Sequence, residues 1–237
     1  MRVLALDTSG RAPSVALVED GRIIEERAGD GSRTHGERLP GELAALGAAW
    51  SSIDVFAVAA GPGSFTGLRI GIATMQGLAL VTERRVVGVS ALEAHAQIAS
   101  RGLVPGAVIA AWIDAQRGDV FSALYQVADA PLFTPERLVE LAAPAVADPV
   151  LTLSEWQSHP THSAIFTGDG AVRYEYAAVH GDPRRRVAAP EPLAGAIGCM
   201  AAVSAGRGLA VLPASVHALY VRRPGAERHR HKGAVAE

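Results

Sequence analysis

The stretch that decides the fold runs Val55-Phe56-Ala57-Val58-Ala59-Ala60-Gly61-Pro62-Gly63-Ser64-Phe65-Thr66-Gly67-Leu68. Its first six residues form the continuous apolar run that is typical of a buried strand, and the next seven form a glycine loop. Helical spacing follows from Leu68 to about Val81. Strand, glycine loop and helix in this order predict one unit of an α/β fold.

A three-stranded meander and a helix are predicted upstream of this unit. The meander consists of apolar runs at Val3 to Leu6 and Ser14 to Val18, a hairpin turn at Asp20-Gly21, and a third strand that opens at Ile23-Ile24. An amphipathic helix is expected from Glu37 to Trp50.

The downstream sequence repeats the opening pattern. A strand at Arg85 to Val89 and a helix at Ala91 to Ser100 are followed by apolar runs at 108–113 and 120–125, separated by Asp114 and a polar turn. The repeat predicts an internal duplication. We therefore expect two mixed-sheet α/β units, over residues 1–100 and 101–222, and a basic tail over 223–237.

Composition excludes several classes of protein. With 237 residues, 49% hydrophobic and 19% charged, the chain is predicted to be globular. The longest apolar stretch, Leu193 to Leu212, is interrupted by glycines, Ser204 and Arg207, which favours a buried helix over a membrane span. The acid Asp7 comes too early for a signal peptide, so the cytoplasm is the expected location.

The inventory of reactive residues is small. Cys199 is the single cysteine and lies in an Ala/Gly-rich stretch, so a core position is favoured over a disulfide or a thiolate cluster. The only lysine, Lys232, lies in the tail, which excludes a P-loop lysine from the body. No two of the eight histidines are four residues apart, so no metal site is expected. The last sixteen residues, 222–237, carry a net charge of +3, and solvated chain is favoured there over phosphate binding.

Asp7, Thr8 and Ser9 form a polar corner after the first strand, with two interpretations of equal weight. Asp7 faces the phosphates and metal of a nucleotide, or it caps its own turn with Thr8 and Ser9. Gly61 and Gly63 also have two interpretations. They let backbone N–H groups bind an anion at the start of the following helix, or they form a tight structural turn. The loop's spacing, G-x-G-x-x-x-G, differs from the dinucleotide-binding pattern.

Two stripes of residues at helical spacing are candidates for helix packing. One stripe is made of Gly67, Gly71, Thr74 and Leu78, and the other of Leu39, Leu43 and Leu46. Small side chains let another helix approach closely. These helices pack on their own sheet, the commoner case, or they form half of an interface with a partner.

The sequence resembles a known family. The matching segments are 4–9 (LALDTS), 35–39 (HGERL), 61–71 (GPGSFTGLRIG), 89–94 (VSALEA), 114–120 (DAQRGDV), 167–170 (TGDG) and 219–222 (LYVR). In this order they are similar to the TsaB family, formerly called YeaZ, a bacterial tRNA-modification factor. The match is good over residues 1 to about 125 and thin beyond.

The resemblance implies a fold and a role. The fold is the two-lobed, duplicated, actin-like fold of the acetate kinase, sugar kinase, Hsp70 and actin superfamily. The role is that of a non-catalytic partner of TsaD, which transfers a threonylcarbamoyl group to N6 of the adenosine next to the anticodon of tRNA, with the ATPase TsaE supporting turnover. The partner-facing helices would then carry the two stripes above, and tRNA would be contacted through the complex.

One substitution separates partner from catalyst. TsaD proteins carry H-x-x-x-H at the segment that matches Ala91 to His95, and the two histidines are ligands of the catalytic metal. This chain has Ala91 at the first position and keeps only His95. A single imidazole does not make a site that needs three protein ligands, so the resemblance implies no catalytic and no metal-binding residue here.

Other functions are kept as alternatives. An ATP-dependent small-molecule kinase would need Asp7 and residues 167–170 to hold a nucleotide, and a peptidase lacks both nucleophile and metal. A direct tRNA binder would use the basic tail. Open at this point are whether ATP or ADP binds at the interface with TsaD and whether the chain forms a homodimer when alone.

Overall fold

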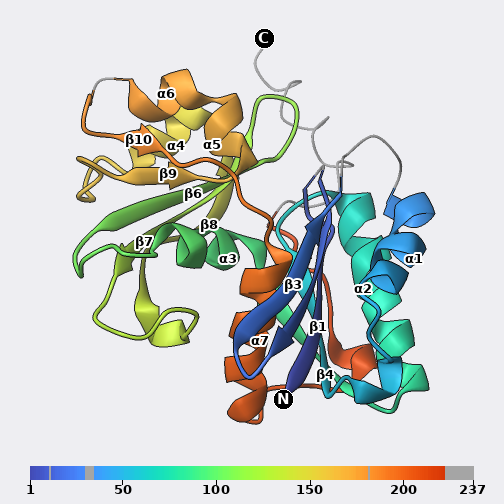
Figure 1. Ribbon diagram of the computed structural model, residues 1–237. Helices are drawn as coiled ribbons and strands as arrows, with labels where there is room; N and C mark the ends of the chain where they lie inside the picture. The colour runs from blue at the N-terminus through green and yellow to red at the C-terminus, as the bar shows by residue number, and fades with distance from the viewer. Residues whose placement is uncertain (11, 30–34, 181, 222–237) are drawn as a thin grey trace.

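The computed structural model describes residues 1–10, 12–29, 35–180 and 182–221, which form two α/β lobes (Figure 1). The predicted basic tail, 223–237, lies outside the described residues. In the described part of the chain no helix combines the length and the apolar character needed to cross a bilayer.

The first lobe is built on a five-stranded sheet in the order β3-β2-β1-β4-β5. Its strands are β1 (Arg2–Asp7), β2 (Ser14–Glu19), β3 (Arg22–Ala28), β4 (Val55–Gly61) and β5 (Arg85–Ser90). The first three are antiparallel, whereas β4 and β5 run parallel to β1. The meander and the strand before the glycine loop are confirmed.

The second lobe repeats this topology. Its sheet has the order β10-β9-β6-β7-β8, which, taken from the β8 edge, is the order of the first sheet with each strand number raised by five. The strands are β6 (Val108–Asp114), β7 (Val120–Val127), β8 (Leu138–Ala147), β9 (Ile165–Thr167) and β10 (Arg186–Val187). The duplicated pair of mixed sheets confirms the predicted actin-like α/β fold class.

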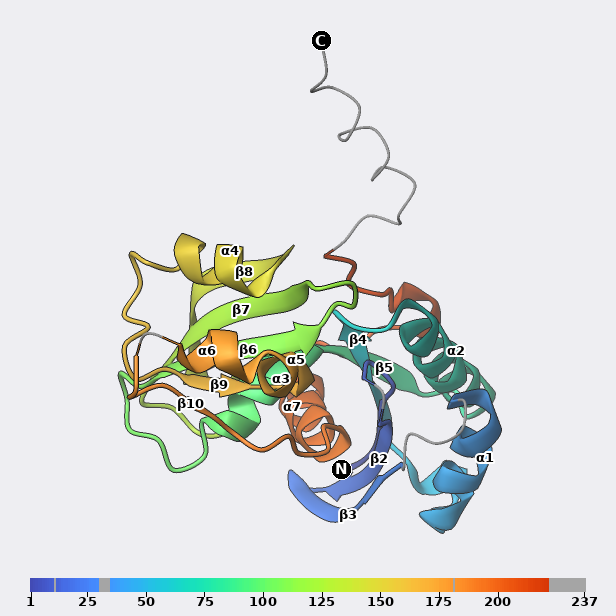
Figure 2. The ribbon, with the colours of Figure 1, turned by 90° about the horizontal axis from the view of Figure 1, so that it is seen from above.

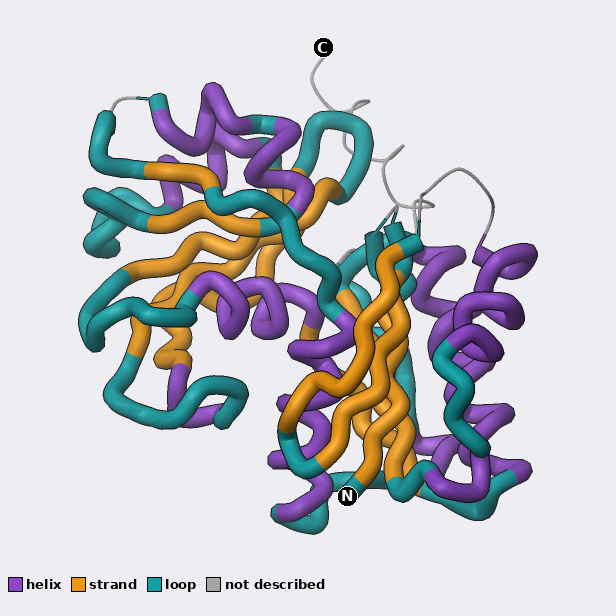
Figure 3. Tube along the Cα trace, viewed as in Figure 1, coloured by secondary structure: helices purple, strands orange, loops and turns teal. Residues whose placement is uncertain are grey.

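Helices cover both faces of each sheet (Figures 2 and 3). Helices α1 (His35–Ala45) and α2 (Phe65–Val81) pack on one face of the first sheet, and α7 (Ala194–Gly206) packs on the other. Helix α3 (Ala91–Ala99) lies between α7 and β6. The far face of the second sheet is covered by α4 (Pro149–Glu155), α5 (Asp169–Arg173) and α6 (Glu175–Val179). Three short 3-10 turns complete the elements: Trp50–Ser52, Pro135–Arg137 and Pro213–Ser215.

Helix α1 is shorter than the predicted Glu37 to Trp50. It ends at Ala45, and Gly47 follows with a φ of +61°, a conformation that terminates helices and suits glycine. Trp50 then begins a separate 3-10 turn.

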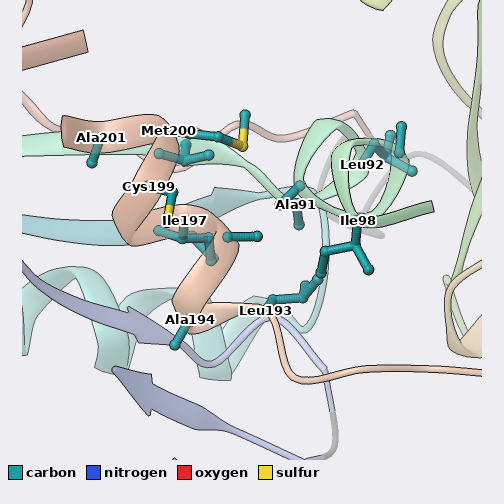
Figure 4. Packing of buried hydrophobic residues seen from close by; sticks show 14 of the residues in the cluster. Ala91, Leu92, Ile98, Leu193, Ala194, Ile197, Cys199, Met200 and Ala201 are labelled. Atoms are coloured by element: carbon teal, nitrogen blue, oxygen red, sulfur yellow. The ribbon is translucent and has the colours of Figure 1, made fainter. Parts of the chain in front are cut away.

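Helix α7 belongs to the predicted second unit by sequence but packs on the first sheet. Its residues and those of α3 share one buried cluster with β1 and β4 (Figure 4). The approach is close, because a Cβ on Gly198 would lie 2.6 Å from Val18 Cγ2. Cys199 is buried in this cluster, as predicted, and burial raises the pKa of its thiol to about 11. The domain boundaries at residues 100 and 222 stay a prediction.

Candidate functional site

The corner after β1 holds Asp7 in a turn of its own. Asp7 Oδ1 accepts hydrogen bonds from the Ser9 amide N at 2.8 Å and from Ser9 Oγ at 2.6 Å. The Asp7 side chain is buried. These two bonds confirm the interpretation that Asp7 caps its own turn, and the nucleotide-facing role of Asp7, Thr8 and Ser9 stays a prediction.

A second acid reaches Asp7 from the other lobe. Burial raises the pKa of the Asp7 carboxyl, the bonds from Ser9 oppose the rise, and the charge of Asp169 adds to it. Asp169 begins α5, and its Oδ1 accepts a hydrogen bond from the Asp114 amide N at 2.9 Å. The sequence analysis included Asp169 only as part of the segment 167–170 that a kinase would need, and did not predict its effect on the pKa of Asp7.

Two carboxylates are fewer than the three protein ligands of a catalytic zinc site. Over the described ranges, no three His, Cys, Asp or Glu side chains are grouped in a way that could hold a metal ion.

The glycine loop is filled by neighbouring backbone. A Cβ on Gly63 would lie 2.5 Å from the Ser9 carbonyl O, and one on Gly61, whose φ is +121°, would lie 2.7 Å from the Leu219 carbonyl O. The Ser64 amide N also donates to Ser9 O at 2.7 Å. These contacts confirm the tight structural turn, because the space that a missing side chain leaves at each glycine is taken by the protein itself. Nucleotide binding at Gly61 and Gly63 stays a prediction.

The same packing continues into α2. Thr8 Oγ1 donates to the Gly67 carbonyl O at 2.8 Å, and a Cβ on Gly71 would lie 2.2 Å from that hydroxyl. Ser64 caps the helix by accepting a bond from the Gly67 amide N at 3.2 Å. Gly67 and Gly71 therefore face the corner after β1.

His95 lies inside α3 as a neutral side chain. It is buried, and desolvation lowers its pKa to about 4. Ala91, one turn earlier, is completely buried. A Cβ on Gly168 would lie 3.6 Å from His95 Cδ2, so the ring faces the strand end before Asp169. Helix α3 therefore contributes one uncharged imidazole to this region.

Five of the seven predicted interface residues point into the lobe. Leu39, Leu43 and Leu46 are at most 5% exposed and pack against the sheet, and Gly67 and Gly71 are buried against Thr8. Their assignment to the surface is wrong, because a stripe of small or apolar residues serves packing on the chain's own sheet equally well. Thr74 and Leu78 are half-buried.

A different set of residues forms the outer face of α1 and α2, which lie side by side (Figure 2). In α2, residues four apart are exposed, and most of the exposed residues of α1 from Leu39 onward are small. This set comprises the exposed residues Pro40, Gly41, Ala44 and Ala45 of α1 and Arg69, Ala73, Gly77, Leu80 and Val81 of α2. We call this set the outer helix face.

Comparisons with protein families and with solved structures show the family of the chain. A family model described as TsaD, tRNA N6-adenosine threonylcarbamoyltransferase, matches residues 30–164, more than half of the chain. The solved structure of YeaZ from Pseudomonas aeruginosa has a TM-score of 0.72 and 30% identity, covering 92% of this chain and 99% of that chain. The chain belongs to the TsaB/YeaZ family.

Other members are similar over different lengths. The Escherichia coli tRNA threonylcarbamoyladenosine biosynthesis protein TsaB is 41% identical over 138 residues, which are 53% of this chain and 55% of that protein. An uncharacterized protein of Mycobacterium tuberculosis is 32% identical over 231 residues, 95% of this chain and 93% of that protein. The chain thus spans about half the length of the curated TsaB relatives that it matches.

Proposed function

We propose that this TsaB/YeaZ family member is a non-catalytic subunit in the biosynthesis of threonylcarbamoyladenosine in tRNA. It would support TsaD in the transfer of a threonylcarbamoyl group to N6 of the adenosine next to the anticodon. The names of the E. coli, Haemophilus influenzae and Bacillus subtilis relatives support the pathway.

The observation that carries the non-catalytic role is the state of α3. Ala91 is a buried methyl group where the TsaD pattern has its first histidine, and His95 is a buried, neutral ring. A metal held by two histidines of one helix cannot be held by this pair.

The partner surface that we propose is the outer helix face. Its small exposed residues allow two helices of another protein to approach closely and complete a four-helix bundle. TsaD is the proposed occupant, TsaE and tRNA would join through that complex, and ATP or ADP at the heterodimer interface is a further part of the proposal. The isolated chain would form a homodimer if the same face also accepts a second copy.

Size-exclusion chromatography with light scattering tests the pairing. The chain is mixed with the TsaD homologue of its own organism, and a one-to-one heterodimer is expected. Ala73→Arg and Gly77→Arg place a charge at exposed positions of the outer helix face, and a Cβ at Gly77 would meet no atom within 4 Å, so both variants are expected to fold. Both variants should elute separately from TsaD.

Ser154→Arg is the matched control, since it adds the same charge at an exposed position of α4 in the other lobe. Pairing that survives both Arg variants contradicts the assigned face. Separate elution of the unmodified chain from TsaD, with and without ATP, TsaE and tRNA, contradicts the partner role. Magnesium-dependent ATP turnover by the isolated chain, lost in Asp7→Asn, would instead support the kinase alternative.

A further inference from the structure

Two aromatic residues lie exposed where α2 begins and where the described chain ends. Phe65 is the first residue of α2 and is 46% exposed, and Tyr220 is 49% exposed. Their ring centroids are 5.5 Å apart, with an interplanar angle of 34°. The guanidinium carbon of Arg69, one helical turn after Phe65, lies 4.1 Å from the Phe65 ring centroid. We call Phe65, Arg69 and Tyr220 the aromatic platform.

The end of the described chain is held in place by the first lobe. Segment 213–221 passes beside α2 (Figure 2), and Gln76 Nε2 donates to the Pro213 carbonyl O at 2.9 Å. Further along, the Leu219 amide N donates to the Ala60 carbonyl O at 2.6 Å. Exposed side chains on a fixed backbone lose less entropy when a ligand binds. The aromatic platform is therefore formed before binding.

Positive charge is concentrated next to the aromatic platform in the sequence. Helix α2 contains no Asp or Glu. Arg222 and Arg223 follow Tyr220 after one residue, and the last sixteen residues, 222–237, carry a net charge of +3. Because the whole chain carries a net charge of −2, residues 1–221 carry −5. A basic segment of this kind is attracted to the phosphates of a nucleic acid.

The combination of exposed rings and arginines favours one class of ligand. Single-stranded nucleic acids stack their bases on aromatic side chains, while Lys and Arg pair with the backbone phosphates. A duplex keeps the faces of its bases stacked on one another, so it would leave the rings unused. An apolar peptide would leave the arginines without an anion. Of these three ligands, a single strand alone occupies both the rings and the charges.

We propose that the aromatic platform and the basic residues that follow it bind single-stranded RNA. A base stacks on the exposed surface of the Phe65–Tyr220 pair, and phosphates pair with Arg69 and with the arginines after Val221. The choice of RNA rests on the proposed function, to which it adds a direct contact between this chain and RNA. The tail, for which solvated chain alone was the favoured prediction, would contact phosphates. Arg69 belongs also to the outer helix face, so the RNA site would adjoin the surface proposed for TsaD.

Fluorescence anisotropy of a labelled single-stranded RNA of about ten nucleotides measures binding to the full chain in the absence of TsaD. Saturable binding is expected. Tyr220→Ala and Phe65→Ala should each weaken it about fivefold or more, because base stacking is lost, and Tyr220→Phe should keep it. Tyr176→Ala is the matched control, since Tyr176 of α6 is 77% exposed and its ring centroid lies 4.9 Å from that of His180. This control should bind RNA like the unmodified chain.

The salt dependence of the affinity tests the charged half of the site. Arg222→Gln/Arg223→Gln removes two positive charges, so the slope of log affinity against log salt should become shallower by about 1.4. Arg84→Gln/Arg85→Gln removes the same charge at two exposed positions beyond the other end of α2. This second double variant should leave the slope unchanged.

Three results would overturn the proposal: no saturable binding of the single strand by the unmodified chain, unchanged affinity in both Ala variants of the platform, or equal binding of a blunt RNA duplex and the single strand. These measurements need no TsaD, so their failure leaves the proposed pairing untouched.

Pairing of Tyr220→Ala with TsaD is measured separately by size-exclusion chromatography. A variant that still forms the heterodimer and binds RNA more weakly supports the RNA site. Loss of pairing with unchanged RNA binding would instead place Tyr220 in the interface with TsaD and overturn the RNA site.

Discussion

Gly71→Ala is the substitution whose outcome the structure defines most sharply. The new Cβ would lie 2.2 Å from Thr8 Oγ1, a distance at which one of the two groups must move. Thr8 is completely buried, and its hydroxyl donates to Gly67 O at 2.8 Å. The hydroxyl can leave only by giving up that bond.

Three contributions set the magnitude. Overpacking costs about 2 kcal/mol. The lost buried hydrogen bond costs about 1 kcal/mol. The higher helix propensity of alanine stabilises the folded variant by about 1 kcal/mol. Gly71→Ala should therefore lower the free energy of unfolding by about 2 kcal/mol. In a Thr8→Ala background the clashing oxygen is absent, so the same change should stabilise by about 1 kcal/mol, and the coupling energy should be about 3 kcal/mol.

Urea denaturation of the four proteins in this double-mutant cycle measures the coupling. Gly77→Ala is the matched control, since it is the same change on an open face of the same helix and should show no coupling to Thr8→Ala. Additivity of Gly71→Ala and Thr8→Ala within about 0.5 kcal/mol would refute the close packing of α2 on the corner after β1.

Three further predictions concern stability. Burial lowers the pKa of His95 from 6.5 to about 4, so that on acidification His95 is protonated in the unfolded chain at a higher pH than in the folded chain. The contribution of neutral His95 to the free energy of unfolding is therefore fully present above pH 6.5 and is lost as the pH falls toward 4. Between pH 7.5 and 5 the unmodified chain should lose about 2 kcal/mol more than His95→Gln in chemical denaturation, and equal losses would contradict a neutral buried ring. Ser122→Ala should raise stability by about 1 kcal/mol, since Ser122 Oγ is buried without a hydrogen-bond partner among the described residues, and a lower urea midpoint would argue against this. Gly168→Ala should destabilise by about 3 kcal/mol or more in the same assay, because φ is +97° and the Cβ would lie 2.3 Å from the Trp112 carbonyl O; an unchanged midpoint would show that the strand end can adapt.

Elements whose pattern is local were predictable from the sequence. The strand and helix that flank the glycine loop were predicted because their apolar runs and spacing are set within a few residues. The repeated strand, acid, turn and strand predicted the second lobe. Strand β8 was not predicted, since its half-exposed pattern is interrupted by Pro144 and it lies at the sheet edge, where pairing with β7 decides its conformation. Strand β10 has two residues and carries no pattern.

The candidate sites needed the fold. Asp169 and Asp7 are far apart in the sequence, and only the approach of the two lobes lets the charge of Asp169 raise the pKa of Asp7. Phe65 and Tyr220 also meet only in the folded chain, where segment 213–221 passes beside α2.

The sequence by itself determined the duplicated α/β architecture, the tight glycine turn as one of two interpretations, and the presence of Ala91 one helical turn before His95. The tertiary structure alone decided the direction in which each helix face points. A stripe of small residues such as Gly67 and Gly71 has the same spacing whether it packs on its own sheet or on a partner, because helical periodicity defines a face and not what lies opposite it.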